Sequence, residues 1–327
     1  PVGLVNTSVG GTPIESWLSA DTQSADPATK SRFDAQSRTY LEFDAAKAAA
    51  AYAKQVATWK VATEKAKAAA KEAPRKPIDP VASRNFKGGP AHLYNGKVAN
   101  LAPYTLRGML WYQGEGNAHS PEAAELYVKQ LTQLVTSWRT LWQDEVPFAW
   151  VQLPNYRDSA AEGWPRMRES MTKVLALPKT GMAITLDIGD PKDIHPKNKQ
   201  EVGKRLSYWA LATVYGRAVP AVSGPLPAGS AIEGDAIRVT FRFADGLKTR
   251  DGAAPRGWLI AGSDKVWKPA EARIDGPAVI VRSAAVSSPI AVRYAWLKNP
   301  DANLVNGAGL PATTFRTDDW PAPTPGK

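Results

Sequence analysis

The sequence contains no cysteine among its 327 residues. This absence excludes disulfide bonds, thiolate metal ligands and a cysteine nucleophile, although it does not fix the cellular compartment. Long apolar runs are also missing, since no stretch approaches the roughly 20 residues that a membrane-spanning helix needs. Histidine is scarce: only His92, His119 and His195 can exchange a proton near neutral pH. The remaining composition, 43% hydrophobic and 22% charged, is that of a globular protein with one large core or a core plus a small second domain.

The net charge of +10 is concentrated in one part of the sequence. The segment from Asp44 to Lys97 holds eleven Lys and Arg residues against four Asp and Glu residues. It predicts a solvated helix followed by a loop, without the interleaved exposed aromatics of a single-strand nucleic-acid binder. We therefore expect no nucleic-acid partner; a polyanion-binding face is the alternative, and steep salt dependence of nucleic-acid binding would support it.

Apolar runs alternate with helical patterns through much of the chain. Each run has ordinary strand length, and several end in polar or glycine residues, as buried parallel strands do. The predicted strands are Val2–Val5, Leu106–Tyr112, Phe148–Leu153 and Met182–Ile188, and the predicted helices are Pro121–Leu141, Trp164–Leu175 and Lys199–Tyr215. This alternation predicts an α/β fold with a parallel, doubly wound sheet.

Two regions depart from that alternation. Residues 44–72 are rich in alanine and predict a long helix. After Val219 the helical periodicity disappears, and period-two stretches such as Ile237–Phe243 predict antiparallel β structure. We expect a core from residues 1–19 and 96–218, a helical insertion over 20–95 and a β-rich C-terminal domain over 219–327.

The loop Asp193-Ile194-His195-Pro196 follows one of the predicted strands. A carboxylate two residues before a histidine suits a general base and the acid that orients it. The alternative is a loop histidine that makes only structural hydrogen bonds. His92 and His119 are weaker candidates, because one lies in the predicted insertion and the other at a helix start.

Two further polar loops follow predicted strands, where open α/β sheets place their active sites. In the first, Gly10 and Gly11 can present backbone N–H groups to an anion, although on their own they are better explained by a structural tight turn. The second places Gln113, Glu115 and Asn117 around two glycines. Gln113 can donate to developing negative charge, and Glu115 can orient a partner or bind a sugar hydroxyl. No metal-ligand spacing, phosphate loop or complete dinucleotide motif is present, so we predict no metal and no cofactor.

The three loops together resemble the sialate O-acetylesterase-like branch of the SGNH hydrolases, which includes carbohydrate acetylesterases. The likeness covers nearly the whole chain, and its most specific part is the WYQGE sequence followed later by DIHP. The matching stretches are Pro1–Ser8, Thr12–Trp17, Leu93–Gly96, Gly108–Ala118, Val151–Leu153, Asp187–Asp190, Asp193–Leu206 and the tail from Arg293 to Asp318.

The resemblance implies a three-layer, flavodoxin-like SGNH fold and metal-free ester hydrolysis by a serine nucleophile. Carried over by position, Gly10 or Gly11 supplies a backbone oxyanion N–H, and Gln113 supplies a side-chain donor. His195 is the base and Asp193 the orienting acid, with Asp190 and Glu115 as alternative acids. The implied substrates are acetylated sugars, either xylan and other hemicelluloses or sialic acid, and the implied setting is polysaccharide degradation by a periplasmic or secreted acetylxylan esterase-like enzyme.

One family feature is missing from the sequence. The nucleophile of the family lies in a Gly-Gln-Ser-Asn-Met-like motif, which these 327 residues do not contain. Ser8 belongs to the following block and is not assigned this role. Because the chain opens at Pro1 in a strand-like run, we expect a fragment or one piece of a nicked protein, with the serine on an upstream segment or a companion chain. The alternative is a non-catalytic carbohydrate-binding protein derived from this fold.

Overall fold

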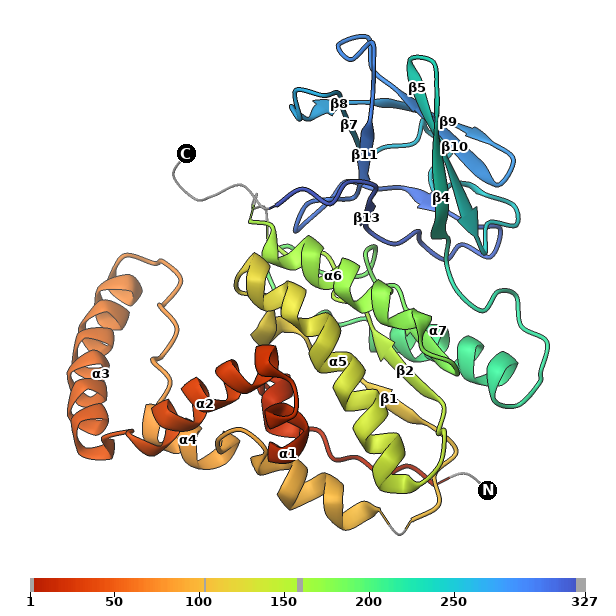
Figure 1. Ribbon diagram of the computed structural model, residues 1–327. Helices are drawn as coiled ribbons and strands as arrows, with labels where there is room; N and C mark the ends of the chain where they lie inside the picture. The colour runs from red at the N-terminus through yellow and green to blue at the C-terminus, as the bar shows by residue number, and fades with distance from the viewer. Residues whose placement is uncertain (1–2, 103, 158–160, 322–327) are drawn as a thin grey trace. The chain divides into compact units, whose positions relative to one another are not determined.

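The computed structural model describes residues 3–102, 104–157 and 161–321 (Figure 1). The chain forms two compact units, residues 1–103 and residues 104–327, which are described separately below. The predicted division into a core of 1–19 and 96–218, an insertion of 20–95 and a β domain of 219–327 stays a prediction.

The N-terminal unit is helical. The long helix predicted over residues 44–72 is confirmed as α3. Each α-helix begins after a side chain that accepts a hydrogen bond from a backbone N–H of the first turn, and these caps explain where the helices start. The capping residues are Ser19, Asp26, Asp44 and Asp79. The helices are α1 (Ala20–Ser24), α2 (Pro27–Leu41), α3 (Ala45–Ala68) and α4 (Pro80–Lys87), with single turns at Ile14–Trp17, Tyr94–Val98 and Ala99–Leu101.

The strand predicted at Val2–Val5 is wrong for the residues that the structure describes. Gly3, Leu4 and Val5 have no strand assignment, and Val2 lies outside the described residues. The Leu4 residue is 93% exposed and Val5 is 60% exposed. An apolar run becomes a strand only when another strand accepts and donates its backbone hydrogen bonds, and none of the described strands pairs with this segment.

The C-terminal unit begins with a parallel three-stranded sheet in the order β1-β2-β3. Its strands are β1 (Met109–Trp111), β2 (Phe148–Val151) and β3 (Thr180–Ala183), in register with Met109 opposite Phe148 and Phe148 opposite Thr180. The accompanying helices are α5 (Pro121–Trp142), α6 (Gly163–Lys173) and α7 (Lys199–Thr213), with single turns at Glu115–Asn117 and Val174–Ala176. The predicted α/β class is thereby confirmed.

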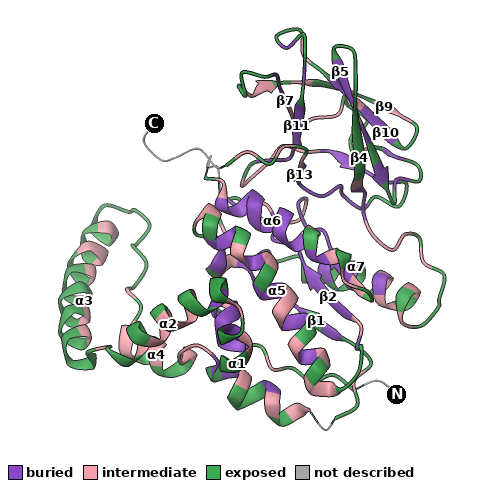
Figure 2. Cartoon of the chain, in the orientation of Figure 1, coloured by how far each residue is buried: buried purple, intermediate pink, exposed green. Residues whose placement is uncertain are grey.

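Helices cover both faces of this sheet and produce three layers (Figure 1). On one face, the α5 residue Trp138 lies with its ring centroid 6.0 Å from those of Trp111 and Phe148. On the other face, α7 packs its apolar side against the alternate residues of β2 and β3, in a cluster of Ala149, Val151, Ala183, Val202, Leu206 and Trp209. Purple dominates the sheet and the inner sides of α5 and α6 in Figure 2, which places the core between these layers.

The third predicted strand is shorter than expected and shifted. Its ladder ends at Ala183, whereas the apolar pattern predicted Met182–Ile188. The chain leaves the sheet because Thr185 Oγ1 donates to the backbone oxygen of Gln152 and Ile188 N bonds to Thr185 O, closing a turn. Ile184, Thr185 and Leu186 are buried without belonging to a strand, which is why periodicity alone misassigned them.

The rest of the C-terminal unit is antiparallel β structure, as predicted. Two four-stranded sheets have the orders β4-β5-β10-β9 and β13-β11-β7-β8, and a two-stranded sheet pairs β12 with β6. The strands are β4 (Leu226–Glu233), β5 (Ala236–Arg242), β6 (Lys248–Thr249), β7 (Trp258–Ala261), β8 (Lys268–Pro269), β9 (Glu271–Asp275), β10 (Ala278–Arg282), β11 (Ala291–Tyr294), β12 (Leu304–Val305) and β13 (Phe315–Arg316).

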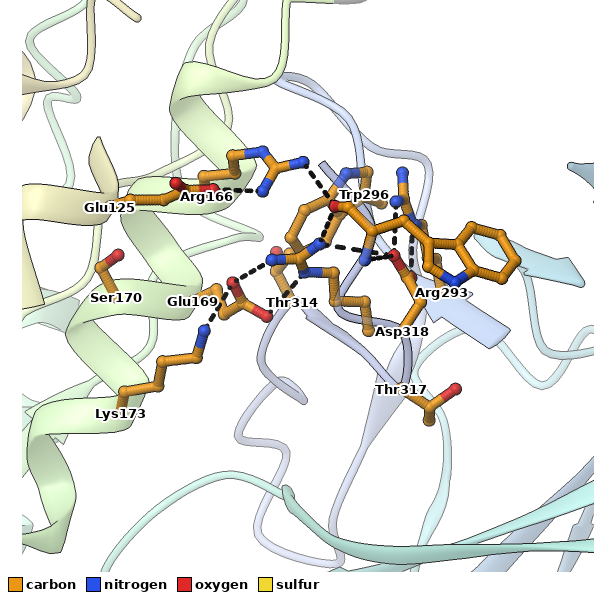
Figure 3. Close-up of polar contacts among 12 residues, drawn as sticks. Glu125, Arg166, Glu169, Ser170, Lys173, Arg293, Trp296, Thr314, Thr317 and Asp318 are labelled. Carbon is orange, nitrogen blue, oxygen red and sulfur yellow. Dashed lines mark hydrogen bonds and ion pairs between the residues drawn. The ribbon is translucent and has the colours of Figure 1, made fainter. Parts of the chain in front are cut away.

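A buried network of charged side chains joins α6 to the last β strands (Figure 3). Asp318 accepts from Arg293 at 2.8 and 2.9 Å, and Arg316 donates to Glu169 on α6 at 2.9 Å. Burial opposes ionisation of Asp318, yet the hydrogen bonds from Arg293 lower the pKa of this carboxyl below its usual range. Buried charges are stable only when they are paired in this way. The network therefore holds the last β strands against α6.

Arg168 makes a second connection between these parts, without any carboxylate. Its side chain is fully buried and donates to four backbone oxygens at 2.7–2.8 Å. Two of the acceptors follow β2 and two follow β11: Leu153, Pro154, Leu297 and Lys298. Burial lowers the pKa of Arg168 to about 9, and the four carbonyl dipoles compensate for placing the cation there.

None of the helices in the described parts of the chain is long and apolar enough to span a bilayer.

Candidate active site

Two of the three predicted polar loops leave the carboxyl edge of the parallel sheet. The loop after β1 carries Gln113, Glu115 and Asn117, and the loop after β3 carries Asp193 and His195. Because carboxyl ends of parallel strands face the same edge, the two loops share one side of the sheet. Contacts within the C-terminal unit, given below, show that they also interact.

Gln113 is held in a fixed orientation. Its Nε2 donates to Asn117 Oδ1 at 2.8 Å, and its Oε1 accepts from the Tyr127 hydroxyl at 2.8 Å. Tyr127 in turn accepts from Trp111 Nε1 at 3.0 Å. Gln113 is 8% exposed, so its carboxamide lies at the surface of the core with both ends engaged. Hydrogen bonds at both ends preorganise the amide, as an oxyanion donor requires.

Asn117 lies behind Gln113 and is fully buried. The single turn Glu115–Asn117 places it there, and its backbone N–H bonds to Gly114 O at 2.9 Å. It therefore contacts Gln113 and not the open surface of the site.

Gly114 allows this loop to turn. Its φ of 158° lies at the limit of the region that favours glycine, and a Cβ there would come within 2.6 Å of Met171 Cε. A side chain at this position would therefore press against Met171 and Leu153.

His195 and Asp193 lie together on the loop between β3 and α7. The His195 backbone N–H donates to Asp193 Oδ1 at 3.0 Å, and its Nδ1 lies 3.5 Å from the same oxygen. The imidazole is 86% exposed, which leaves its Nε2 side accessible within this unit. Asp190, the alternative acid, uses Oδ1 to accept from Lys192 N at 2.8 Å. Its backbone oxygen accepts from Asp193 N at 3.2 Å, so Asp190 supports the turn that carries Asp193.

Distant residues hold the His195 loop in place. Arg205 on α7 donates to both carboxylate oxygens of Asp187 at 2.7 and 2.9 Å. Gly189 N donates to Asn155 Oδ1 at 2.7 Å, and a Cβ on Gly189 would lie 2.1 Å from Asn155 O. Sequence reasoning did not identify Arg205 or Asn155 as site supports, because their partners are separated by many residues and carry no local motif.

Lys199 connects the two loops electrostatically, and sequence reasoning missed it. Its Nζ donates to the Tyr112 hydroxyl at 3.3 Å and lies 4.6 Å from the Tyr112 ring centroid. Desolvation lowers the pKa of Lys199, while the negative charges of Glu115 and Asp193 raise it. Burial and the charge of Glu115 raise the pKa of Tyr112 to about 12, so this hydroxyl stays protonated.

Burial raises the pKa of Glu115 above its ordinary value, and the positive charges of Lys199 and His195 oppose that rise. Glu115 therefore lies within electrostatic reach of His195, which brings the loop after β1 and the loop after β3 into one site. A carboxyl whose pKa is raised by burial beside a histidine is typical of functional sites.

Glu115→Gln is expected to make the protein more stable than wild type at pH 7 but not at pH 4. The pKa of Glu115 is higher in the folded state than in the unfolded state, so the folded protein holds this proton more tightly. The free energy of unfolding of the wild type therefore falls as the pH rises above the unfolded pKa. Glutamine does not ionise, so the variant does not undergo this fall in the free energy of unfolding between pH 4 and pH 7. Urea unfolding at both pH values measures the difference, and an equal or lower stability of the variant at pH 7 would contradict the assignment.

Gly10 and Gly11 lie in the N-terminal unit. They form a turn in which Gly11 has a φ of 67°, a conformation that favours glycine. The turn is followed by Thr12, whose Oγ1 donates to Val9 O at 2.8 Å and accepts from Trp17 Nε1 at 3.0 Å. The two glycines are thus held by local hydrogen bonds in their own unit.

Comparisons with known proteins agree on one family. Residues 83–211 match the family model described as carbohydrate esterase, sialic acid-specific acetylesterase. The sialate O-acetylesterases of Rattus norvegicus and Mus musculus are each 27% identical over 92% of this chain and 56% of their own length. The crystal structure of a novel carbohydrate acetylesterase from Xanthomonas citri superposes with a TM-score of 0.69 at 42% identity, covering 73% of this chain and 56% of the other.

The chain thus spans about half the length of the curated relatives it matches. All these relatives carry esterase names, and none supports the non-catalytic alternative. The family match, the curated relatives and the solved structure together support the sialate O-acetylesterase-like carbohydrate esterases of the SGNH type as the family of this chain.

Proposed function

We propose that this chain is part of a carbohydrate O-acetylesterase, a carboxylic ester hydrolase that removes acetyl groups from sugars by a serine-esterase mechanism. The observation that supports this most directly is the geometry of His195. It lies beside Asp193 on one loop and within electrostatic reach of Glu115 on the loop that carries the fixed carboxamide of Gln113.

In the proposed reaction, serine attacks the acetyl carbonyl and His195 Nε2 takes the hydroxyl proton. Asp193 stabilises the imidazolium that forms, because its Oδ1 lies on the Nδ1 side of the ring. The tetrahedral oxyanion accepts a hydrogen bond from Gln113 Nε2. His195 returns the proton to the sugar oxygen, and water then releases acetate from the acyl-enzyme by the same steps.

Asp193 is the preferred orienting acid. Its carboxylate is the one whose distance to the His195 ring is short, whereas the Asp190 carboxylate accepts from a neighbouring backbone N–H. Glu115, whose pKa is raised by burial, is better suited to bond to a sugar hydroxyl or to interact electrostatically with a protonated His195. Asn117 is proposed to position Gln113 without contacting substrate.

The nucleophile serine is proposed to lie on a segment outside these 327 residues. The Gly-Gln-Ser-Asn-Met-like motif of the family does not occur in this sequence. Its source, an upstream part of the same polypeptide or a companion chain, can be read from the intact mass of the native protein. Acetyl-ester hydrolysis by a protein consisting of these residues alone would overturn this part of the proposal.

The proposed substrates are acetylated xylan or other hemicelluloses and acetylated sialic acid, in a periplasmic or secreted setting. The activities named for the relatives support an acetylated carbohydrate as substrate and are compatible with each of these sugars.

Acetate release by the natural full-length protein tests the function. Acetylated xylan, acetylated glucomannan, O-acetylated sialic acid and a non-carbohydrate acetyl ester are compared at equal acetyl concentration. We expect at least one sugar substrate to be hydrolysed with a higher kcat/KM than the non-carbohydrate ester. Absence of acetate release from every sugar would contradict the proposed function.

A further inference from the structure

A shallow groove runs along α3 in the N-terminal unit, and none of the candidate active-site residues lines it. It has a volume of about 470 Å³ and lies between the helix and the extended segment that returns from it. Figure 1 shows this segment running beside α3, and Figure 2 shows that the helix is largely exposed. The helix contains no buried residue, although it is 24 residues long.

Aromatic side chains fix the return segment against the helix. Trp59 Nε1 donates to Pro74 O at 2.7 Å, and the Tyr52 hydroxyl donates to Pro77 O at 3.4 Å. Trp59 is half-buried and lines the groove, so one edge of its ring is held by the hydrogen bond. Prolines stiffen the segment, and the groove is therefore preformed.

The groove carries cations on both walls. Lys54 lines it from the helix and Arg75 lines it from the return segment, while Gln55 and Thr58 add polar groups. The surroundings are strongly basic, since residues 45–77 contain eight Lys and Arg residues and two Glu residues.

We propose that this groove is a binding site for an acidic polysaccharide of the uronic-acid type. The apolar C–H face of a sugar ring packs against the Trp59 ring, and carboxylates bind Lys54 and Arg75. Thr58 and Gln55 bond to sugar hydroxyls. The inference rests on the proposed function for its biological sense: a second site would hold the acetylated polymer near the enzyme.

Other polyanions fit the groove less well. Single-stranded nucleic acid uses several aromatic side chains on which successive bases stack, whereas Trp59 is the aromatic that lines this groove in the described chain. An anionic membrane surface would require a continuous apolar helix face, and α3 alternates alanine with lysine around much of its circumference.

Isothermal titration calorimetry with an unacetylated oligogalacturonide tests the site at physiological salt on the natural full-length protein. Lys54→Glu/Arg75→Glu is expected to weaken binding about tenfold or more, because two ion contacts become repulsive. Lys60→Glu/Lys67→Glu is the matched control. It changes the net charge equally, and at 3.6 residues per turn both positions lie on the side of α3 away from Thr58 and Ala62. We expect it to change the affinity less than threefold.

Each outcome of this experiment decides the proposal. Equal weakening by both double variants would show diffuse attraction and overturn a built site. Tighter binding of a neutral xylo-oligosaccharide or of single-stranded DNA would overturn the acidic-glycan assignment, and so would no binding by wild type. Hydrolysis of 4-nitrophenyl acetate, measured in parallel, is expected to be unchanged in both variants. Because the probe carries no acetyl group, loss of the proposed esterase function would leave the binding result interpretable.

Discussion

Replacing His195 with alanine is expected to lower acetate release from acetylated sugar by about 10³-fold or more. The variant keeps the Gln113 carboxamide and the Asp193 carboxylate but removes the group that takes the serine proton. Loss of the base from a serine–histidine–acid site typically costs this much or more in kcat, while binding and oxyanion contacts leave residual activity. The measurement is kcat/KM for acetate release by the natural full-length protein.

Because the His195 side chain is exposed, this experiment separates a loss of catalysis from a loss of stability. At 86% exposure its removal is expected to leave the thermal midpoint unchanged, so lost activity reports chemistry. His119→Ala is the control, since His119 is also exposed and its Nδ1 contacts Gly116 O at 3.1 Å beside the same loop. Near-wild-type activity of His195→Ala would defeat the assignment. A larger loss in Asp190→Asn than in Asp193→Asn would transfer the orienting role to Asp190.

Arg168→Met is expected to destabilise the C-terminal unit by about 3–5 kcal/mol, although the new side chain has a similar length. Arginine satisfies four buried backbone oxygens, and methionine leaves them without these donors. An unsatisfied buried acceptor costs about 1–3 kcal/mol, partly recovered when the loops shift. Removing the desolvated cation offsets some of this loss. Urea unfolding at pH 7, followed by tryptophan fluorescence, measures the change in free energy.

Arg282→Met provides the comparison within the same unit. The Arg282 side chain is 63% exposed and pairs at 3.6 Å with a more exposed Glu271. We expect its replacement to change the free energy of unfolding by no more than about 0.5 kcal/mol. Equal effects of the two substitutions would mean that the carbonyl contacts of Arg168 contribute nothing specific. Arg168→Lys should fall between them, because an ammonium cannot reproduce the planar set of five N–H donors.

The elements that carried strong local signals were predicted well. Helix α5 begins at Pro121 after the Ser120 cap and ends at Trp142, one residue beyond its predicted end. The β5 strand, Ala236–Arg242, lies within one residue of the predicted Ile237–Phe243 at each end. Such agreement is expected where periodicity, capping and turn residues favour the same structure. Of the predicted strand Met182–Ile188, only Met182 and Ala183 belong to β3. The rest was wrong because burial and strand pairing are different properties, and a buried turn held by Thr185 has the composition of a strand.

The sequence by itself indicated the resemblance to carbohydrate acetylesterases, the alternating α/β layers, the β-rich C-terminal segment and the candidacy of His195, Asp193 and Gln113. These features can be predicted from the sequence because motifs and periodicities depend only on residues that are close together in the chain. Only the tertiary structure revealed that Lys199 and Glu115 connect the two loops, that Tyr127 fixes Gln113, and that Arg168 holds the chain through carbonyl oxygens. Those contacts join residues that are distant in sequence. Their strength depends on burial and on a few ångströms of separation, which no local pattern encodes.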